Sequence, residues 1–140
     1  MKIEISRLNL LSALYYVPEK DSDPFGYREG GGEKLFCFEL DAAQSLEFEP
    51  DKTKFLGNLV FAGKAADGAS GQPCTEFPLG NYLFAQKRKI VSREEIIDMA
   101  VEIQQEGLWQ RLLFGEKLYL RYLFEDGCSV TQLFRPYTES

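Results

Sequence analysis

The chain has 140 residues, of which 44% are hydrophobic, and a formal net charge of −6. This length and apolar share suffice for one domain with its own core. The negative charge disfavours nucleic acid as a partner, because neutralising phosphates requires clustered Lys and Arg. No apolar run approaches the roughly 20 residues that cross a bilayer, and residues 1–4 lack the apolar core of a signal peptide. We therefore expect a soluble, cytoplasmic protein without a membrane partner.

The chain contains no histidine. This excludes Ser-His and Cys-His nucleophile pairs and imidazole metal sites. Cys37, Cys74 and Cys128 are odd in number and far apart, which favours neither a disulfide framework nor a zinc site. We expect no cofactor and no metal, and an enzyme is the less favoured reading because no pair of catalytic residues stands out.

The first half, residues 1–76, is predicted to be rich in strands. Residues 3–17 begin with alternating Ile3 and Ile5 and continue into a β-favouring aromatic run, which indicates one long, bulged strand ended by Pro18. Residues 18–33 are acidic and rich in Gly and Pro, and they are expected to form a mobile loop.

Two more strands are predicted in this half. Residues 35–40 alternate, with Phe36 and Phe38 on one face and Cys37 on the other. Residues 55–62 are predicted to form the next strand. The small-residue segment 63–73 then indicates a loop.

Residues 77–137 carry the clearest pattern. A strand follows Pro78 and Gly80, with Tyr82 and Phe84 on one face. Leu83 and Ala85 are expected on its other face. The Lys-Arg-Lys run that follows is expected to be a solvated strand end.

A helix is predicted next, starting with a capping box in which the Ser92 hydroxyl accepts from the Glu95 amide and the Glu95 carboxylate reaches back. Residues 104–106 are expected to be solvated, and Gly107 to end the helix. The buried stripe of this helix is expected to be Ile96, Met99, Ala100 and Ile103.

The remaining elements are short. Residues 108–114 are predicted to form a helical turn docked on the sheet. Residues 118–124 are apolar on both faces, as in a central strand covered on both sides. Asp126-Gly127 indicates a hairpin turn. Residues 130–135 then return antiparallel, and Pro136 is expected to stop the ladder.

These elements indicate an α+β fold: a single domain, 1–140, with an antiparallel sheet, one main helix and a short helical turn. With catalytic motifs missing, the aromatic residues become the candidate functional groups. The simpler interpretation of each aromatic residue is that it is an ordinary core or surface residue without a ligand-binding role. Together they can instead line an apolar pocket in which rings stack on a ligand and hydroxyls orient it. They are Tyr15, Tyr16, Phe36, Phe38, Tyr82, Trp109, Tyr119 and Tyr122.

The chain resembles the GyrI-like small-molecule-binding domains, the effector-binding modules of AraC-type and multidrug-responsive regulators, in their stand-alone form. The resemblance rests on the Pro-x-Gly-x-Tyr pattern in residues 77–84, a following helix, a turn at Trp109, a strand around Tyr122 and a last strand ending in Pro136. It implies two strand-helix-strand-strand repeats. The first repeat would be degenerate, because the loop 18–33 stands where its helix belongs.

The resemblance also implies a groove that binds hydrophobic, often cationic, ligands. By position it implies ligand-binding roles for Tyr82, Trp109 and Tyr122, to which Tyr16, Phe38 and Glu39 of the first half are added as candidates. Arg121 stands where many relatives carry a glutamate, which puts a cationic ligand in doubt unless Glu39 substitutes.

Three functions follow as hypotheses. The first is a domain that senses or sequesters a hydrophobic aromatic molecule, and a ligand-sized pocket would favour it. The second is a protein-interaction or inhibitor module using the same groove, and a flat exposed apolar patch would favour it. The third is a small-molecule hydrolase using a carboxylate and a tyrosine.

Overall fold

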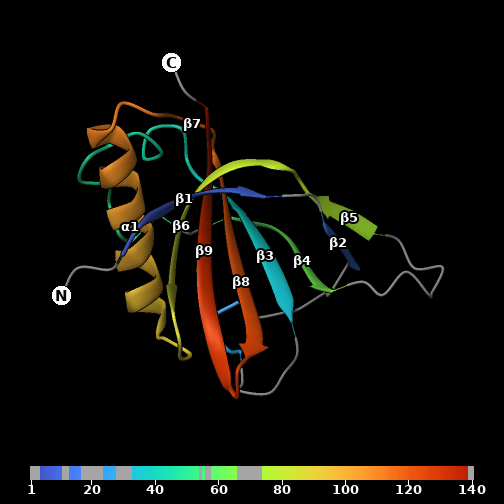
Figure 1. Ribbon diagram of the computed structural model, residues 1–140. Helices are drawn as coiled ribbons and strands as arrows, with labels where there is room; N and C mark the ends of the chain where they lie inside the picture. The colour runs from blue at the N-terminus through green and yellow to red at the C-terminus, as the bar shows by residue number, and fades with distance from the viewer. Residues whose placement is uncertain are drawn as a thin grey trace.

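The computed structural model describes residues 4–10, 13–16, 24–27, 33–53, 55, 58–65 and 74–138. In this part of the chain, an antiparallel sheet packs against one main helix (Figure 1). The α+β class predicted from the sequence is therefore confirmed. The elements are β1 (Ser6–Leu10), β2 (Ala13–Tyr16), β3 (Lys34–Glu39), β4 (Leu59–Ala65), β5 (Cys74–Phe77), β6 (Gly80–Lys87), α1 (Arg93–Trp109), β7 (Leu113–Phe114), β8 (Lys117–Glu125) and β9 (Cys128–Thr138).

The sheet curls round until its two ends meet. Its strands follow the order β1-β6-β9-β8-β3-β4-β2-β5, and β7 adds to β9. β1 and β2 pair with β6 and β5 in one register, from Ser6 opposite Phe84 to Tyr16 opposite Cys74. β2 also pairs with β4 on its other edge. The sheet is therefore closed, with an inner face turned away from α1 and an outer face that carries the helix (Figure 1).

The predicted alternation along the strands is confirmed and separates two clusters. On β6, Leu83 and Ala85 pack in the outer cluster, whereas Tyr82 and Phe84 belong to the inner one. On β3, Phe36 and Phe38 likewise belong to the outer cluster and Cys37 to the inner one. β8 is buried on both faces, because successive residues feed one cluster and then the other.

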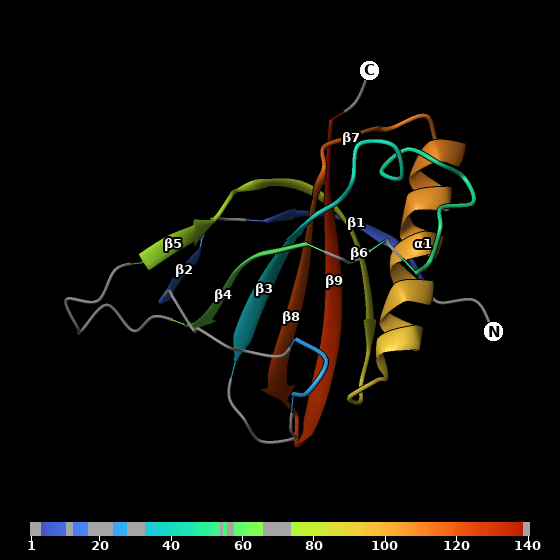
Figure 2. The ribbon, with the colours of Figure 1, turned by 180° about the vertical axis from the view of Figure 1, so that it is seen from behind.

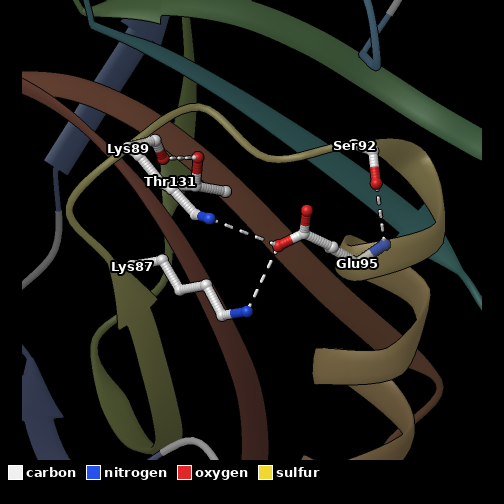
Figure 3. Close-up of polar contacts among 5 residues, drawn as sticks. All are labelled: Lys87, Lys89, Ser92, Glu95 and Thr131. Carbon is white, nitrogen blue, oxygen red and sulfur yellow. Dashed lines mark hydrogen bonds and ion pairs between the residues drawn. The ribbon is translucent and has the colours of Figure 1, made fainter. Parts of the chain in front are cut away.

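The helix begins where the sequence predicts. The backbone N–H of Glu95 donates to the Ser92 hydroxyl over 3.2 Å. The Glu95 carboxylate, however, turns to Lys87 (3.2 Å) and Lys89 (3.9 Å), as Figure 3 shows. Half of the capping box is thus replaced by ion pairs with the end of β6.

α1 is buried on two sides. The expected stripe faces the sheet, and Ile97, Val101 and Gln104 are buried as well. The segment between β3 and β4 covers this second side (Figure 2). The Gln104 amide donates to the carbonyls of Gln44 and Glu47. The expectation that Gln104 is solvated is therefore wrong.

The helix also continues past Gly107 to Trp109. Gly107 packs against the ring of Phe114, and a Cβ at this position would overlap that ring. The glycine makes room for a neighbour and does not terminate the helix. The predicted helical turn over 108–114 is wrong, because its first residues extend α1 and Leu113–Phe114 form β7.

β8 and β9 form the predicted hairpin. Asp126 and Gly127 have φ of 51° and 80°, and Glu125 pairs with Cys128 across them. This matches a two-residue turn with positive φ at both positions. Pro136 does not stop β9: it lies between the end of the β8 ladder and the start of the β7 ladder, where a missing N–H is tolerated.

Two further expectations concern the strand predicted over 55–62 and the loop predicted over 18–33. The strand expected over 55–62 is β4, Leu59–Ala65, and Phe55 is buried in the outer cluster from the preceding turn. Most of the expected loop 18–33 lies outside the described residues. Its described part includes a turn at Pro24–Phe25. Among the described residues, no helix has both the length and the apolar composition needed to cross a membrane.

Candidate ligand site on the inner face of the sheet

An aromatic cluster fills the inner face of the closed sheet. Rings from different strands meet there: the Phe77 centroid lies 4.7 Å from that of Tyr119, 5.1 Å from that of Tyr82 and 5.4 Å from that of Phe134. The half-buried Phe84 ring extends the group, 5.0 Å from Phe134. We call this group the inner cluster; its buried members are Tyr15, Leu35, Cys37, Phe77, Tyr82, Tyr119 and Phe134.

Burial keeps the ionisable groups of the inner cluster neutral at pH 7. It raises the pKa of Tyr82 to about 12, that of the Cys37 thiol to about 11, and that of Tyr119 further. A neutral hydroxyl can donate a hydrogen bond but does not act as a base. The Tyr82 hydroxyl already donates to the Pro78 carbonyl.

A polar row crosses the inner face beside the inner cluster. Pairing aligns Leu35, Arg121, Gln132 and Gln86 across β3, β8, β9 and β6. The Arg121 Nε donates to the Gln132 Oε1 over 2.8 Å, and the Gln132 Nε2 donates to the Gln86 Oε1 over 2.9 Å. The Arg121 guanidinium lies 4.8 Å from the centre of the Phe134 ring. We call Arg121, Gln132 and Gln86 the polar row.

Tyr15 connects the polar row to Glu33. Its hydroxyl donates to the Glu33 carboxylate over 2.7 Å, and the nearby Arg121 acts on its pKa in the opposite direction to Glu33. Burial, reinforced by the bond to Glu33, raises the pKa of Tyr15 to about 12. The neutral Tyr15 hydroxyl therefore lies near both Glu33 and Arg121, and no direct ion pair joins these two side chains.

Toward one side of the inner face, the side chains become more exposed to solvent. Leu35 and Phe134 are fully buried, whereas Phe84 and Arg121 are half-buried and Gln86 is exposed. Phe84 and Gln86 lie two residues apart on β6, on the same face. At this more exposed side of the inner face a guanidinium and an amide lie near an aromatic ring, and we call Phe84, Gln86, Arg121 and Gln132 together the mouth.

The six expected ligand-binding residues do not meet in one groove. Tyr82 lies in the inner cluster, but Phe38 and Tyr122 lie in the outer cluster on the opposite face. The Tyr122 hydroxyl donates to the Pro24 carbonyl over 2.6 Å, and its ring stacks on Tyr27 with centroids 4.3 Å apart. Tyr122 therefore holds the segment 24–27 against the sheet.

The other three expected residues are also separate. Trp109 is 79% exposed, at the end of α1 opposite to the helix end that follows β6 (Figure 1). Glu39 forms an ion pair with Lys117 over 2.8 Å. The β3–β8 register places this pair at the opposite end of the inner cluster from Arg121. Tyr16 pairs through its backbone with Lys64 and Cys74, and its side chain lies outside the described residues.

Two clefts on the described surface are lined mainly by polar groups. One, of about 610 Å³, runs between α1 and the segment around Pro50, and its charges include the ion pairs Lys52–Asp98 and Lys87–Glu95. The other, also about 610 Å³, lies beside Glu39. Within the described chain, no group of three Cys, Asp or Glu side chains converges as a metal site requires. Neither cleft offers the aromatic surface found at the mouth.

The mouth residues Phe84, Gln86 and Gln132 were not identified as site residues from the sequence. Because alternate residues of a strand share a face, Phe84 and Gln86 lie on the same face of β6 as Tyr82, and this pattern could have identified them from the sequence. The position of Gln132 beside them depends on the β6–β9 register, which joins residues 46 positions apart in the chain. No protein-family model and no curated protein matches the chain.

Proposed function

We propose that the chain is a domain that binds a hydrophobic, aromatic small molecule, to sense or sequester it. The observation that carries this proposal is the mouth, where the half-buried Phe84 ring lies beside the polar row. Aromatic surface with a few fixed polar groups is typical of ligand sites. Side chains fill the inner cluster, so it serves as a rigid floor and the ligand rests on Phe84.

The order of strand pairing supports a likeness to the GyrI-like domains. β3 pairs with β4 as β8 pairs with β9, and β2 pairs with β4 as β6 pairs with β9. β1 pairs with β6, and β3 with β8, across the two halves. A duplicated strand-helix-strand-strand chain would pair in this way, with α1 as the helix of the second repeat. The free thiols of Cys37 and Cys128 fit a reducing, cytoplasmic location.

The test is binding of naphthalene-2-carboxamide, a neutral aromatic probe, measured by calorimetry and thermal shift. We expect it to raise the melting temperature, because it binds the native state. Phe84→Ala should weaken binding by about 1–3 kcal/mol through loss of aromatic contact. Phe124→Ala is the matched control, because Phe124 is 56% exposed and remote from the inner face.

Equal losses in the two variants, or no binding of the probe and its charged analogues, would contradict the proposal. A partner protein would then be the better candidate. One observation favours that second function: two large apolar side chains are exposed where α1 leads to β7, Trp109 (79% exposed) at the end of α1 and Leu113 (55% exposed) at the start of β7. Exposed tryptophan is common at the centres of protein interfaces. Trp109→Ala should leave probe binding unchanged if the mouth is the ligand site.

A further inference from the structure

We infer that the ligand of the mouth carries a carboxylate or similar planar anion, which Arg121 binds with help from Gln86. This inference rests on the proposed function, because it assigns the charge of the ligand at the same site. It starts from the charge balance around Arg121.

The guanidinium of Arg121 has neutral partners. It donates to Gln132 and lies over the Phe134 ring, and the neutral Tyr15 hydroxyl is nearby. Among the described residues, no carboxylate lies within ion-pairing distance of it. Several more exposed cations do have such partners, since Lys52, Lys87, Arg88, Lys89 and Lys117 each pair with Asp or Glu. The buried Arg135, in contrast, donates to carbonyl groups and to Gln104.

These contacts also orient Arg121. The hydrogen bond from Nε to Gln132 and the ring of Phe134 hold the guanidinium in one plane. Gln132 accounts for one of its five N–H donors. The others can serve a planar anion, which a guanidinium binds through two parallel hydrogen bonds.

Gln86 supplies a second donor group. Its Oε1 accepts from Gln132, which directs its NH₂ away from that bond. The side chain is exposed and two residues from Phe84 on the same strand. An aromatic carboxylate can therefore place its ring on Phe84 and its anionic group above Gln132, which lies between Gln86 and Arg121 in the polar row.

The experiment compares three probes of one shape by calorimetry: 2-naphthoate, naphthalene-2-carboxamide and 2-naphthylmethylammonium. For the wild-type protein we expect naphthoate to bind at least about tenfold more tightly than the carboxamide, since bonds to charged groups contribute about 1.5 kcal/mol or more. The ammonium should bind most weakly. Added NaCl should reduce the advantage of naphthoate.

Variants identify the group responsible. Arg121→Gln should remove the preference for naphthoate while carboxamide binding stays within about threefold, because the ring contact is kept. Arg88→Gln is the control for net charge and should keep the preference. Gln86→Ala, at an exposed position, provides a second test that does not depend on the folding of the Arg121 variant. It should weaken naphthoate more than carboxamide.

The outcomes separate the two proposals. If the carboxamide and naphthoate bind wild-type protein equally well, Arg121 has no anion-binding role and the proposed function still holds. If Arg121→Gln and Gln86→Ala both still bind naphthoate more tightly than the carboxamide, the inference is overturned and the proposed function still holds. If no probe binds, the inference and the proposed function both fail.

Discussion

Arg135 is a guanidinium buried at 0% exposure that links separate parts of the chain. It donates to the Gln104 Oε1, the Ser45 carbonyl and the Gly115 carbonyl over 2.9–3.3 Å, and it lies 4.4 Å from the centre of the Phe114 ring. Burial lowers its pKa to about 9, so it stays charged at pH 7. Its bonds join β9, α1, the turn before β8 and the segment after β3.

We therefore expect Arg135→Met to destabilise the protein by about 2–4 kcal/mol. Methionine keeps much of the volume but leaves two buried acceptors, the Gln104 Oε1 and the Ser45 carbonyl, without this donor. An uncompensated buried acceptor costs about 1–3 kcal/mol. Arg135→Lys should also destabilise, because one ammonium cannot reach all three acceptors. Urea unfolding measures both changes. Arg88→Met, at a largely exposed arginine, is the control and should stay within about 0.5 kcal/mol of wild type.

At the scale of elements, α1 depends on its first turn. The helix is held at its start by the Ser92 hydroxyl, and Glu95 bridges to Lys87 and Lys89 (Figure 3). Thr131 fixes the same corner, since its hydroxyl donates to the Lys89 carbonyl over 2.8 Å. The cap and the corner therefore contribute to stability by different contacts.

Ser92→Ala should lower the free energy of unfolding by about 1 kcal/mol, because it removes the acceptor for the Glu95 amide. Ser92→Asn should change it little, since asparagine caps equally well. Glu95→Gln should cost less than Ser92→Ala, because exposed ion pairs contribute about 0–1 kcal/mol. Chemical denaturation of the three variants checks this order. A larger loss in Glu95→Gln than in Ser92→Ala would show that the ion pairs, and not the hydroxyl, hold the helix start.

For the whole molecule, closure of the sheet decides what is enclosed. The Cys37 thiol is 2% exposed inside it, and burial raises its pKa to about 11. A protonated, enclosed thiol reacts only when the structure opens. Cys128, in contrast, is half-buried at the β8–β9 hairpin.

A protein that keeps Cys37 alone, made by Cys74→Ser and Cys128→Ser, should react with Ellman's reagent at pH 8 only through opening. Adding Ser92→Ala should raise that rate about fivefold, because 1 kcal/mol changes the population of the open state by this factor. A protein that keeps Cys128 alone should react faster and respond little to Ser92→Ala. If Cys37 reacts fast and Ser92→Ala does not change the reaction rate, the sheet opens locally near β3.

The sequence by itself determined the local pattern of this protein. Period-two alternation separated Tyr82 from Leu83 and Phe36 from Cys37, because neighbouring side chains on a strand point to opposite faces. Ser92 marked the helix start and Asp126-Gly127 the hairpin, because caps and tight turns depend on a few adjacent residues. The α+β class followed from these local signals.

Only the tertiary structure decided which faces meet. Gln104 is buried because a segment about 60 residues away covers it. Gly107 lies inside α1, where it leaves room for the Phe114 ring, and does not mark the helix end. Tyr82 and Tyr122 look alike along the chain, but they lie on opposite faces of the closed sheet. The mouth around Arg121 exists because β6, β8 and β9 align in one register. Register and closure depend on contacts between distant segments, which the local pattern does not encode.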